Sequence, residues 1–316
     1  MFNRAEIVDK EFVRRVKAKD FPQSATQTTL LESGLNSYEA IELFESQMVS
    51  RLLDIVQREM KGRGESYYTI GSSGHEGNVV LGKALSLEDM LFLHYRSGAL
   101  MMQRARLKPE VAAAFDCLLG SAAAVDEPIA GGRHKVWGSL PLNVPPQTST
   151  IASHLPKAVG AALSIGRSFD LDIDTRKLSR NSIVFCSFGD ASANHSTAQG
   201  AINTAGWIAR QQIKLPLLFL CEDNGLGISV NTPPGWIADS FSRRPHIEYF
   251  RGDGLHLFDA YRQARKAVNW VRKLRRPAFL HLEMVRLLGH AGSDVETMYR
   301  TQYDVELAEG QDPLLH

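Results

Sequence analysis

Three segments of the sequence are apolar along their whole length, and their spacing constrains the fold more than any other feature. They are SIVFCSF at 182–188, PLLFLCE at 216–222 and AFLHLEMV at 278–285. Segments with helical periodicity separate them, at 195–210 and 257–274. A strand that is apolar on both faces must be covered on both faces, which is typical of a parallel sheet between two layers of helices. The pattern predicts an α/β fold with a mostly parallel sheet and helices on both faces.

The first part of the chain is predicted to contain a long helix. Apolar residues recur at steps of three and four from Ile41 to Ile55, so we expect a helix that is capped by Ser37 and ends at the glycines of KGRG. We also expect a helix at about 5–18, a strand-like run at 91–95, helical structure to about 119, a loop over 120–150, a helix near 152–167 and a strand at 247–252. These elements divide the chain into an N-terminal arm and loop, 1–36, and one α/β domain, 37–316.

Composition and charge exclude several classes of function. With 44% hydrophobic residues among 316, the chain can bury a substantial core. Its 36 basic and 35 acidic residues nearly cancel, which disfavours nucleic acid or an anionic membrane as a partner. No apolar run reaches the ~20 residues that cross a bilayer. Three cysteines without a CxxC pair, and an N-terminus unlike a signal or transit peptide, lead us to expect a cytoplasmic protein.

Oxygen-bearing side chains follow two of the predicted strands. Asp190 comes directly after 182–188, and Asp223 and Asn224 follow the next apolar run. Ligands of open parallel sheets bind outside the carboxyl ends of the strands, where these oxygens could hold Mg²⁺ together with phosphate oxygens. Small residues around Asp190 would let a diphosphate approach, and the helix predicted to begin near Asn194 offers free N–H groups. Taken alone, Asp190 is explained equally well by a tight turn with helix-capping residues.

Four segments, in order, resemble one family. GDASANHSTAQG followed by CEDNGLGIS is similar to the GDG…NN motif of thiamine-diphosphate enzymes. Tyr95 and Arg96 in LHYRSGALMMQR match the family's diphosphate-binding pair, and Ser149 and Ile151 in TSTIASHLPKAVGAA match its pyrimidine-contacting segment. LLGHAGSDVETMYR resembles its active-site histidine segment. Over residues 37–313 the chain resembles the α chain of the decarboxylating component of 2-oxo acid dehydrogenase complexes, which implies a thiamine-diphosphate-binding fold.

The resemblance implies a metal site and a diphosphate site. Mg²⁺ would be held by Asp190, Asn224 and the backbone carbonyl of Leu226. Tyr95 and Arg96 would contact the diphosphate, the arginine through charge-assisted hydrogen bonds. The cofactors that it implies are therefore thiamine diphosphate and Mg²⁺.

The resemblance also implies a catalytic residue. Ile151 would press on the cofactor and bend its two rings together. His290 would donate a proton as the acyl group passes to a lipoyl arm, work suited to a group that titrates near neutrality. The full set of implied cofactor contacts is Tyr95, Arg96, Ser149, Ile151, Gly189, Asp190, Ala191, Ser192, Asn224, Leu226 and His290.

Three positions depart from the family pattern. Ala191 stands for the third glycine of the motif, and Asp223 for the first of its two asparagines. An alternative that these two departures leave open is a non-catalytic relative that keeps the fold for assembly or regulation. Ala291 stands where regulated members carry a serine, so kinase control through that serine is not expected.

The partners and the substrate are also implied by the resemblance. The glutamate that activates the cofactor belongs to the family's β chain, so we expect activity only with a β subunit or a β-like domain, in an α2β2 assembly, and acyl transfer to a lipoyl-bearing acyltransferase. The chain stops at His316, as a short member or as the first half of an α-β fusion. The serine-bearing TSTIASHLP favours a branched-chain 2-oxo acid as substrate, with pyruvate and acetoin as alternatives.

Other conspicuous segments receive plainer interpretations. GDGLH at 252–256 is interpreted as a strand-to-helix turn, and GSSGHEG at 71–77 lacks the last glycine of a GxSxG nucleophile turn, so a serine hydrolase is not indicated. Glu76 is expected to open a helix, and for it a structural role is at least as well supported as a chemical one. His134 and Lys135 either contact a substrate carboxylate or are solvated, and the sequence does not decide. His154 is interpreted as a hydrogen-bonded group behind the cofactor site.

Overall fold

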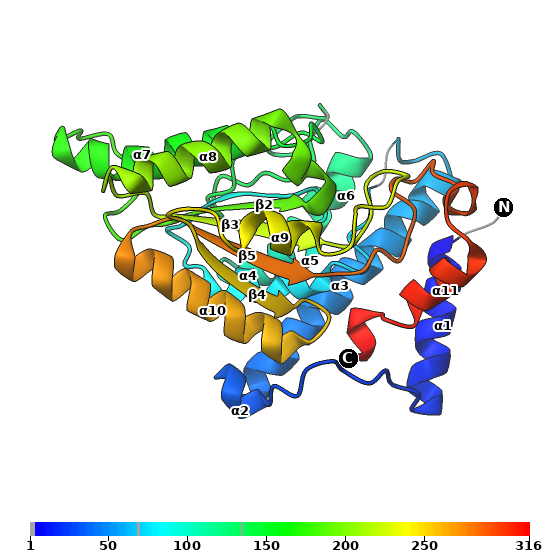
Figure 1. Cartoon of the computed structure of the whole chain (residues 1–316). Coiled ribbons are helices and arrows are strands. Elements are labelled where there is room, and N and C mark those ends of the chain that lie inside the picture. The colour runs from blue at the N-terminus through cyan, green and yellow to red at the C-terminus, as the bar shows by residue number, and fades with distance from the viewer. Residues whose placement is uncertain (1–3, 68–69, 134) are drawn as a thin grey trace.

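A single parallel sheet forms the centre of the molecule. The computed structural model describes residues 4–67, 70–133 and 135–316. Its five strands run parallel in the order β1-β2-β3-β5-β4 (Figure 1). Their bounds are β1 Met90–Phe92, β2 Val184–Gly189, β3 Leu217–Asp223, β4 Glu248–Asp253 and β5 Ala278–Glu283. The prediction of an α/β fold with a parallel sheet is confirmed.

Helices cover both faces of this sheet, as predicted. Figure 1 shows α7 and α8 on one side and α10 on the other. The first layer comprises α7 Leu155–Asp170, α8 Ser196–Arg210 and α9 Trp236–Phe241. The second comprises α3 Ser37–Gly62, α4 Val79–Ala84, α5 Gly98–Ala105 and α10 Leu257–Leu274. The remaining helices are α1 Arg4–Ala18, α2 Leu30–Ser33, α6 Ala113–Ser121 and α11 Gln302–Glu309.

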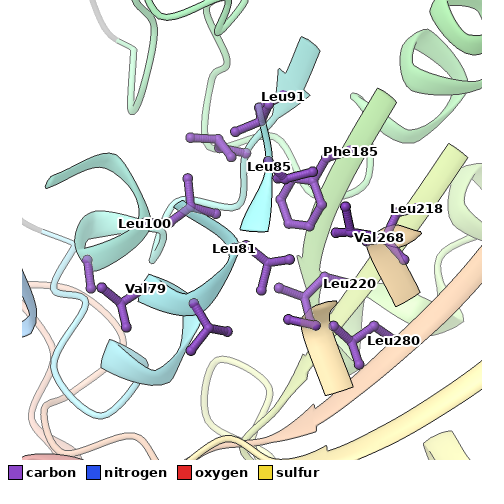
Figure 2. Close-up of a cluster of buried hydrophobic side chains, with 14 of the residues drawn as sticks. Val79, Leu81, Leu85, Leu91, Leu100, Phe185, Leu218, Leu220, Val268 and Leu280 are labelled. Atoms are coloured by element: carbon purple, nitrogen blue, oxygen red, sulfur yellow. The ribbon is translucent and has the colours of Figure 1, made fainter. Parts of the chain in front are cut away.

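Alternate strand residues point into two separate cores, which explains why the strands are apolar throughout. Phe185, Leu218 and Leu280 belong to the core under α4, α5 and α10, and Figure 2 shows them packed against side chains of those helices. Phe219 and Phe279 point the other way, toward α7, α8 and α9. Both cores exclude water almost completely, and burial of this kind stabilises the fold by roughly 25 cal/mol per Å² of apolar surface.

The cap of the long helix α3 corrects one prediction. The helix begins at Ser37, but the cap is Asn36. The Oδ1 atom of Asn36 accepts the N–H of Glu39 at 2.9 Å, and the Glu39 carboxylate accepts the N–H of Asn36 at 3.0 Å. This reciprocal pair occupies two N–H groups that a helix leaves unpaired at its start, and Ser37 is already helical.

Several expected boundaries shift for local reasons. The strand expected at 91–95 is β1, which ends at Phe92, because His94 N–H turns to the Ser187 hydroxyl and Ser97 N–H closes a turn on the carbonyl of His94. The helix expected from 152 begins at Leu155, since Ala152 has a left-handed φ of 61°. The helical stretch expected to 119 is α5 and α6. The helix expected to open at Glu76 is a 3₁₀ turn, Glu76–Asn78, that continues into α4, and the helices α2, α9 and α11 were not predicted.

Both ends of the described chain pack on the body. Ala5 and Val8 of α1 lie in a small core with Leu287 and Leu288. Near the C-terminus, Asp312 pairs with buried Arg51 of α3. The proposed boundary between an arm, 1–36, and a domain, 37–316, stays a prediction. None of the helices in the described ranges is both long and apolar enough to cross a membrane.

Candidate active site at the carboxyl edge of the sheet

Asp190 lies where the prediction placed it, directly beyond β2. Gly189 and Glu222 are paired across β2 and β3, so Asp190 and Asp223 leave the sheet side by side. The Asp190 side chain is buried and accepts the hydroxyl of Thr232 at 2.5 Å. Burial raises the pKa of Asp190 to about 6, a rise that the hydrogen bond from Thr232 opposes and the charge of Asp223 reinforces. Asp223 itself pairs with His281 at 2.9 Å, so among the described residues Asp190 is the carboxylate of the two that has no ion-pair partner.

Asn224 stands at the neighbouring strand end, and both ends of its amide are bonded. Its Nδ2 donates to His75 Nε2 at 2.8 Å, and its Oδ1 accepts the N–H of Leu226 at 2.9 Å. The loop then folds back, so that Thr232 N–H reaches the carbonyl of Gly225. Within the described residues, no hydrogen bond or ion pair joins Asp190 to Asn224 directly, and their shared ion stays a prediction.

Leu226 and the glycine before it shape this loop. Gly225 has a φ of 72°, the left-handed conformation that favours glycine. In the part of the chain that the structure describes, the carbonyl of Leu226 accepts no hydrogen bond. A free carbonyl oxygen beside a carboxylate and an amide oxygen is a suitable ligand for Mg²⁺.

Gly189, Ala191 and Ser192 surround Asp190 closely. A methyl group added to Gly189 would lie 3.4 Å from the ring of His94, an ordinary contact distance, so Gly189 and His94 are close neighbours. The methyl carbon of Ala191 lies 3.5 Å from the position that a Cβ atom on Gly227 would occupy, which is an ordinary contact distance. Ala191, which stands for the family's third glycine, is therefore accommodated without a clash inside the protein. Ser192 is buried.

Arg96 and His290, which are far apart in sequence, are brought together. Arg96 Nη2 donates to the carbonyl of His290 at 3.1 Å and lies 3.3 Å from its Nδ1, and Arg96 Nη1 donates to the carbonyl of Gly71. The ring of Tyr95 meets that of His290 edge to face, with 5.9 Å between centroids. Tyr95, Arg96 and His290 thus form one cluster, as a shared site requires.

The pKa of His290 differs from the expectation. Burial, then the charges of Arg96 and Arg286, lower the pKa of His290 to about 4, so the ring is neutral at pH 7 rather than titrating near neutrality. Because a guanidinium only donates, Nδ1 must accept and the hydrogen resides on Nε2. His290 therefore presents one N–H donor and no charge.

Arg96 and Arg286 are buried cations that lack carboxylate partners. Arg96 is 2% exposed and Arg286 is 1% exposed. Arg286 donates to the carbonyls of Gly227 and Ile228 and to the hydroxyl of Tyr299. Among the described residues neither arginine forms an ion pair. Burying an unpaired charge is costly unless an opposite charge accompanies it, so this cluster suits an anionic ligand.

Among the residues before α7, His154 contacts the strand that precedes Asp190. Ile151 is partly exposed and Ser149 is half-buried. His154 is buried, and its Nε2 lies 2.7 Å from the carbonyl of Ser187, to which it donates. Burial lowers the pKa of His154 to about 4, so it is a neutral hydrogen-bonded group, in agreement with the interpretation of its sequence position.

A buried cluster of His75, His94 and Glu222 was missed by the sequence analysis. His75 Nδ1 lies 2.6 Å from Glu222 Oε2, and His94 Nδ1 lies 3.6 Å from Glu222 Oε1. Burial lowers the pKa of His75 to about 4. Burial opposes ionisation of Glu222, but the interactions with His75 and His94 outweigh it and lower the pKa of Glu222 to about 2. A signal was present, since His94 precedes Tyr95 and Glu222 precedes Asp223 in the matched motifs.

The other interpretations have mixed outcomes. Glu76 is fully buried and paired with Arg51 at 2.7 Å, so its structural role is confirmed. GDGLH joins β4 to α10 with His256 as the helix cap, which confirms the turn. Lys135 is not solvated, because its side chain is buried against Glu127 at 3.0 Å. His134 lies outside the described residues.

Comparison with known proteins identifies relatives over most of the chain. Residues 44–316 match the model of the dehydrogenase E1 component family. The chain is 26% identical to the 2-oxoisovalerate dehydrogenase subunit alpha of Bacillus subtilis, over 89% of this chain and 81% of that protein. It is also 26% identical to the mitochondrial 2-oxoisovalerate dehydrogenase subunits alpha of mouse and human, over 87% and 86% of this chain. The chain spans 58% of the length of these two mammalian relatives.

Proposed function

The chain belongs to the dehydrogenase E1 component family, and on that premise we propose that it is the α subunit of a 2-oxo acid dehydrogenase that decarboxylates a branched-chain 2-oxo acid. The relatives named above are 2-oxoisovalerate dehydrogenase subunits, which supports an oxidoreductase acting on an oxo group. Thiamine diphosphate and Mg²⁺ are the proposed cofactors, and a thiamine-diphosphate-binding fold is the proposed form of the α/β domain.

One observation carries the cofactor proposal: unpaired buried charges of opposite sign lie in the same region. Asp190 is the acidic part, with Asp223 beside it already paired with His281, and Arg96 and Arg286 form the basic part. A divalent cation with a diphosphate would neutralise both parts, since the cation faces the carboxylates and the diphosphate oxygens face the guanidinium groups. A structural ion-pair network would instead have paired these residues with each other.

Each matched residue then has a proposed role. Asp190, Asn224 and the carbonyl of Leu226 would hold Mg²⁺, and Tyr95 and Arg96 would bind the diphosphate. The backbone of Gly189, Ala191 and Ser192 would lie along it. When bound, thiamine diphosphate supplies the carbanion and the electron sink for loss of CO2. Ser149 would contact the pyrimidine, and Ile151 would hold the cofactor bent.

His290 would hold and move the proton of the acyl-transfer step. Its Nε2 carries the hydrogen, as the contact with Arg96 requires. A bound diphosphate adds negative charge near Arg96, which weakens the effect of that cation on His290. The pKa of His290 would therefore rise toward the range in which a histidine donates a proton at neutral pH.

The proposal includes partners and a location. The activating glutamate would come from a β subunit or β-like domain in an α2β2 assembly, because the buried Glu76 and Glu222 of this chain are already bonded to Arg51 and His75. A lipoyl-bearing acyltransferase would accept the acyl group. A reducing, cytoplasmic location is consistent with the three free cysteines, Cys117, Cys186 and Cys221.

The choice of substrate rests on the relatives and on a cavity. A cavity of about 190 Å³ lies beside Tyr95 and is lined in part by Leu53 and Trp137. This small volume suits a short acyl chain rather than a large ligand. Pyruvate and acetoin dehydrogenases are the alternatives, and steady-state assays of the reconstituted complex with branched-chain 2-oxo acids, pyruvate and acetoin decide among them.

Calorimetry of thiamine diphosphate binding tests the cofactor proposal. We expect Mg²⁺-dependent binding, measured with the chain alone and with its β partner, and its loss in Asp190→Asn, which removes the charge but keeps the shape. Asp253→Asn is the matched control, because Asp253 also ends a strand at this edge but bonds only its own turn and the helix that follows. Undiminished binding in Asp190→Asn would contradict the site. No binding by the wild-type assembly would favour the non-catalytic alternative.

A further inference from the structure

We propose that Glu222 and His75 are positioning residues for Asn224, through two consecutive hydrogen bonds that decide which atom of its amide faces the metal. The inference rests on the proposed function, because the orientation of Asn224 matters only if Asn224 is a ligand. Neither Glu222 nor His75 belongs to the residues on which the site was predicted.

The first hydrogen bond fixes the protonation of His75. Glu222 is fully buried on β3, and its Oε2 lies 2.6 Å from Nδ1 of the equally buried His75. An ionised carboxylate can only accept, so Nδ1 carries the hydrogen. Asn78 Nδ2 donates to the same oxygen at 3.3 Å, and Asn78 is itself held by the N–H of Leu100. Two side chains therefore hold the Oε2 atom of Glu222 in place.

The second hydrogen bond fixes Asn224. With hydrogen on Nδ1, the neutral ring of His75 can only accept at Nε2, and Asn224 Nδ2 donates to it at 2.8 Å. The oxygen of the amide accepts Leu226 N–H and keeps a second lone pair free. If the amide were turned over, its Nδ2 hydrogens would face the N–H of Leu226, and its oxygen would face the lone pair on His75 Nε2. Both ends of the amide therefore select the orientation that leaves its oxygen available to a metal.

General magnitudes give the loss of metal affinity expected when these two consecutive hydrogen bonds are removed. Partners that orient a metal ligand typically change metal affinity by about 10- to 100-fold when they are removed. An amide free to turn would have to be ordered at each binding event, which lowers affinity without removing any ligand atom.

A transition metal held by the same cluster is the competing explanation. Ligand atoms of His75, His94 and Glu222 all lie within 4.8 Å of one another, and two imidazoles with a carboxylate suit zinc. However, both nitrogens of His75 already have partners. A metal on Nδ1 would move the hydrogen to Nε2 and set it against the N–H of Asn224. The hydrogen bonds of His75 therefore favour its role as a link between Glu222 and Asn224 over a role as a metal ligand.

The test measures metal affinity directly. Mn²⁺ replaces Mg²⁺, and its free concentration is followed by electron paramagnetic resonance in the presence of thiamine diphosphate with the assembled protein. We expect the dissociation constant to rise about tenfold or more in His75→Phe and in Glu222→Leu, which remove an acceptor from the two consecutive hydrogen bonds. His75→Gln should restore most of the affinity, because a glutamine oxygen can accept from Asn224. His256→Gln is the matched control, since His256 caps α10 by accepting the N–H of Asp259 and has no hydrogen bond to Asn224 or to Asp190.

The outcomes separate this inference from the proposed function. Glu222→Leu removes the acceptor and keeps a side chain of similar volume, and circular dichroism checks that each variant folds. If wild-type protein binds Mn²⁺ and Asp190→Asn does not, but the His75 and Glu222 variants bind normally, the positioning role is wrong while the metal site stands. If wild-type protein binds no Mn²⁺, both fail. One equivalent of zinc that is lost in His94→Gln would also overturn the positioning role.

Discussion

His290 lies against the guanidinium of Arg96, and this contact determines how the imidazole titrates. The low pKa of about 4 arises from burial first and then from Arg96 and Arg286. Burial and cations both disfavour the imidazolium, so an anion bound to those cations must act in the opposite direction. Under the proposed function, the protonation state of His290 is therefore coupled to occupation of the proposed diphosphate site.

We predict that the pKa of His290 rises by at least about one unit when Mg²⁺ and thiamine diphosphate bind, equivalent to about 1.4 kcal/mol. Because the bound form holds its proton to higher pH, binding takes up protons between pH 4 and the new pKa. Nitrogen-15 NMR of labelled histidine against pH measures the shift. Mg²⁺ alone is the control, and an unchanged or lower pKa with the cofactor bound would contradict the assigned contact.

At the scale of elements, the start of α3 provides a direct test of the cap. Asn36→Ala removes the acceptor of the Glu39 N–H, and we expect it to lower the free energy of unfolding by about 1 kcal/mol. Ser37→Ala is the matched control and should cost less than about 0.5 kcal/mol, because Ser37 lies inside the helix. Urea denaturation measures both. A larger loss of stability in Ser37→Ala than in Asn36→Ala would indicate that Ser37 is the cap, as the sequence predicted.

The elements that could be predicted from the sequence are those whose pattern reflects burial. β2, β3 and β5 are apolar throughout because two cores use them, and α10 shows its period because one face packs on the sheet. α4 and α9 have six residues each, too few for a helical period to show. The end of β1 depends on a hydrogen bond from His94 to Ser187, a contact that no local pattern encodes.

The site also has residues that local sequence places correctly and residues that only tertiary packing brings together. Asp190 and Asp223 could be placed together because parallel neighbouring strands end at one edge. His75, His94 and Glu222 come from three segments that meet only when the sheet and its helices have packed. The pKa of His290 likewise depends on Arg96, which is 194 residues away in the chain.

At the scale of the whole molecule, Arg51 joins α3 to the C-terminal segment. It donates to both oxygens of Asp312, at 2.8 and 2.9 Å, and to Glu76. Arg51→Met leaves two buried carboxylates unpaired, and we expect a loss of about 3–5 kcal/mol in the free energy of unfolding. Asp312→Asn should cost clearly less, because the remaining pair is neutral overall. Guanidinium denaturation compares the two variants, and equal losses would contradict this charge balance.

The order of the strands also has a consequence for synthesis on the ribosome. β1 pairs with β2, whose residues follow roughly ninety positions later. At translation rates of about 5–20 residues per second, the nascent segment with β1 and its neighbouring helices waits roughly 5–20 seconds for that strand. During this interval, side chains such as Leu81, Leu91 and Leu100 lack the strands β2, β3 and β5 that complete their core. We therefore expect chaperones to bind the nascent chain most strongly while its second third is still being synthesised.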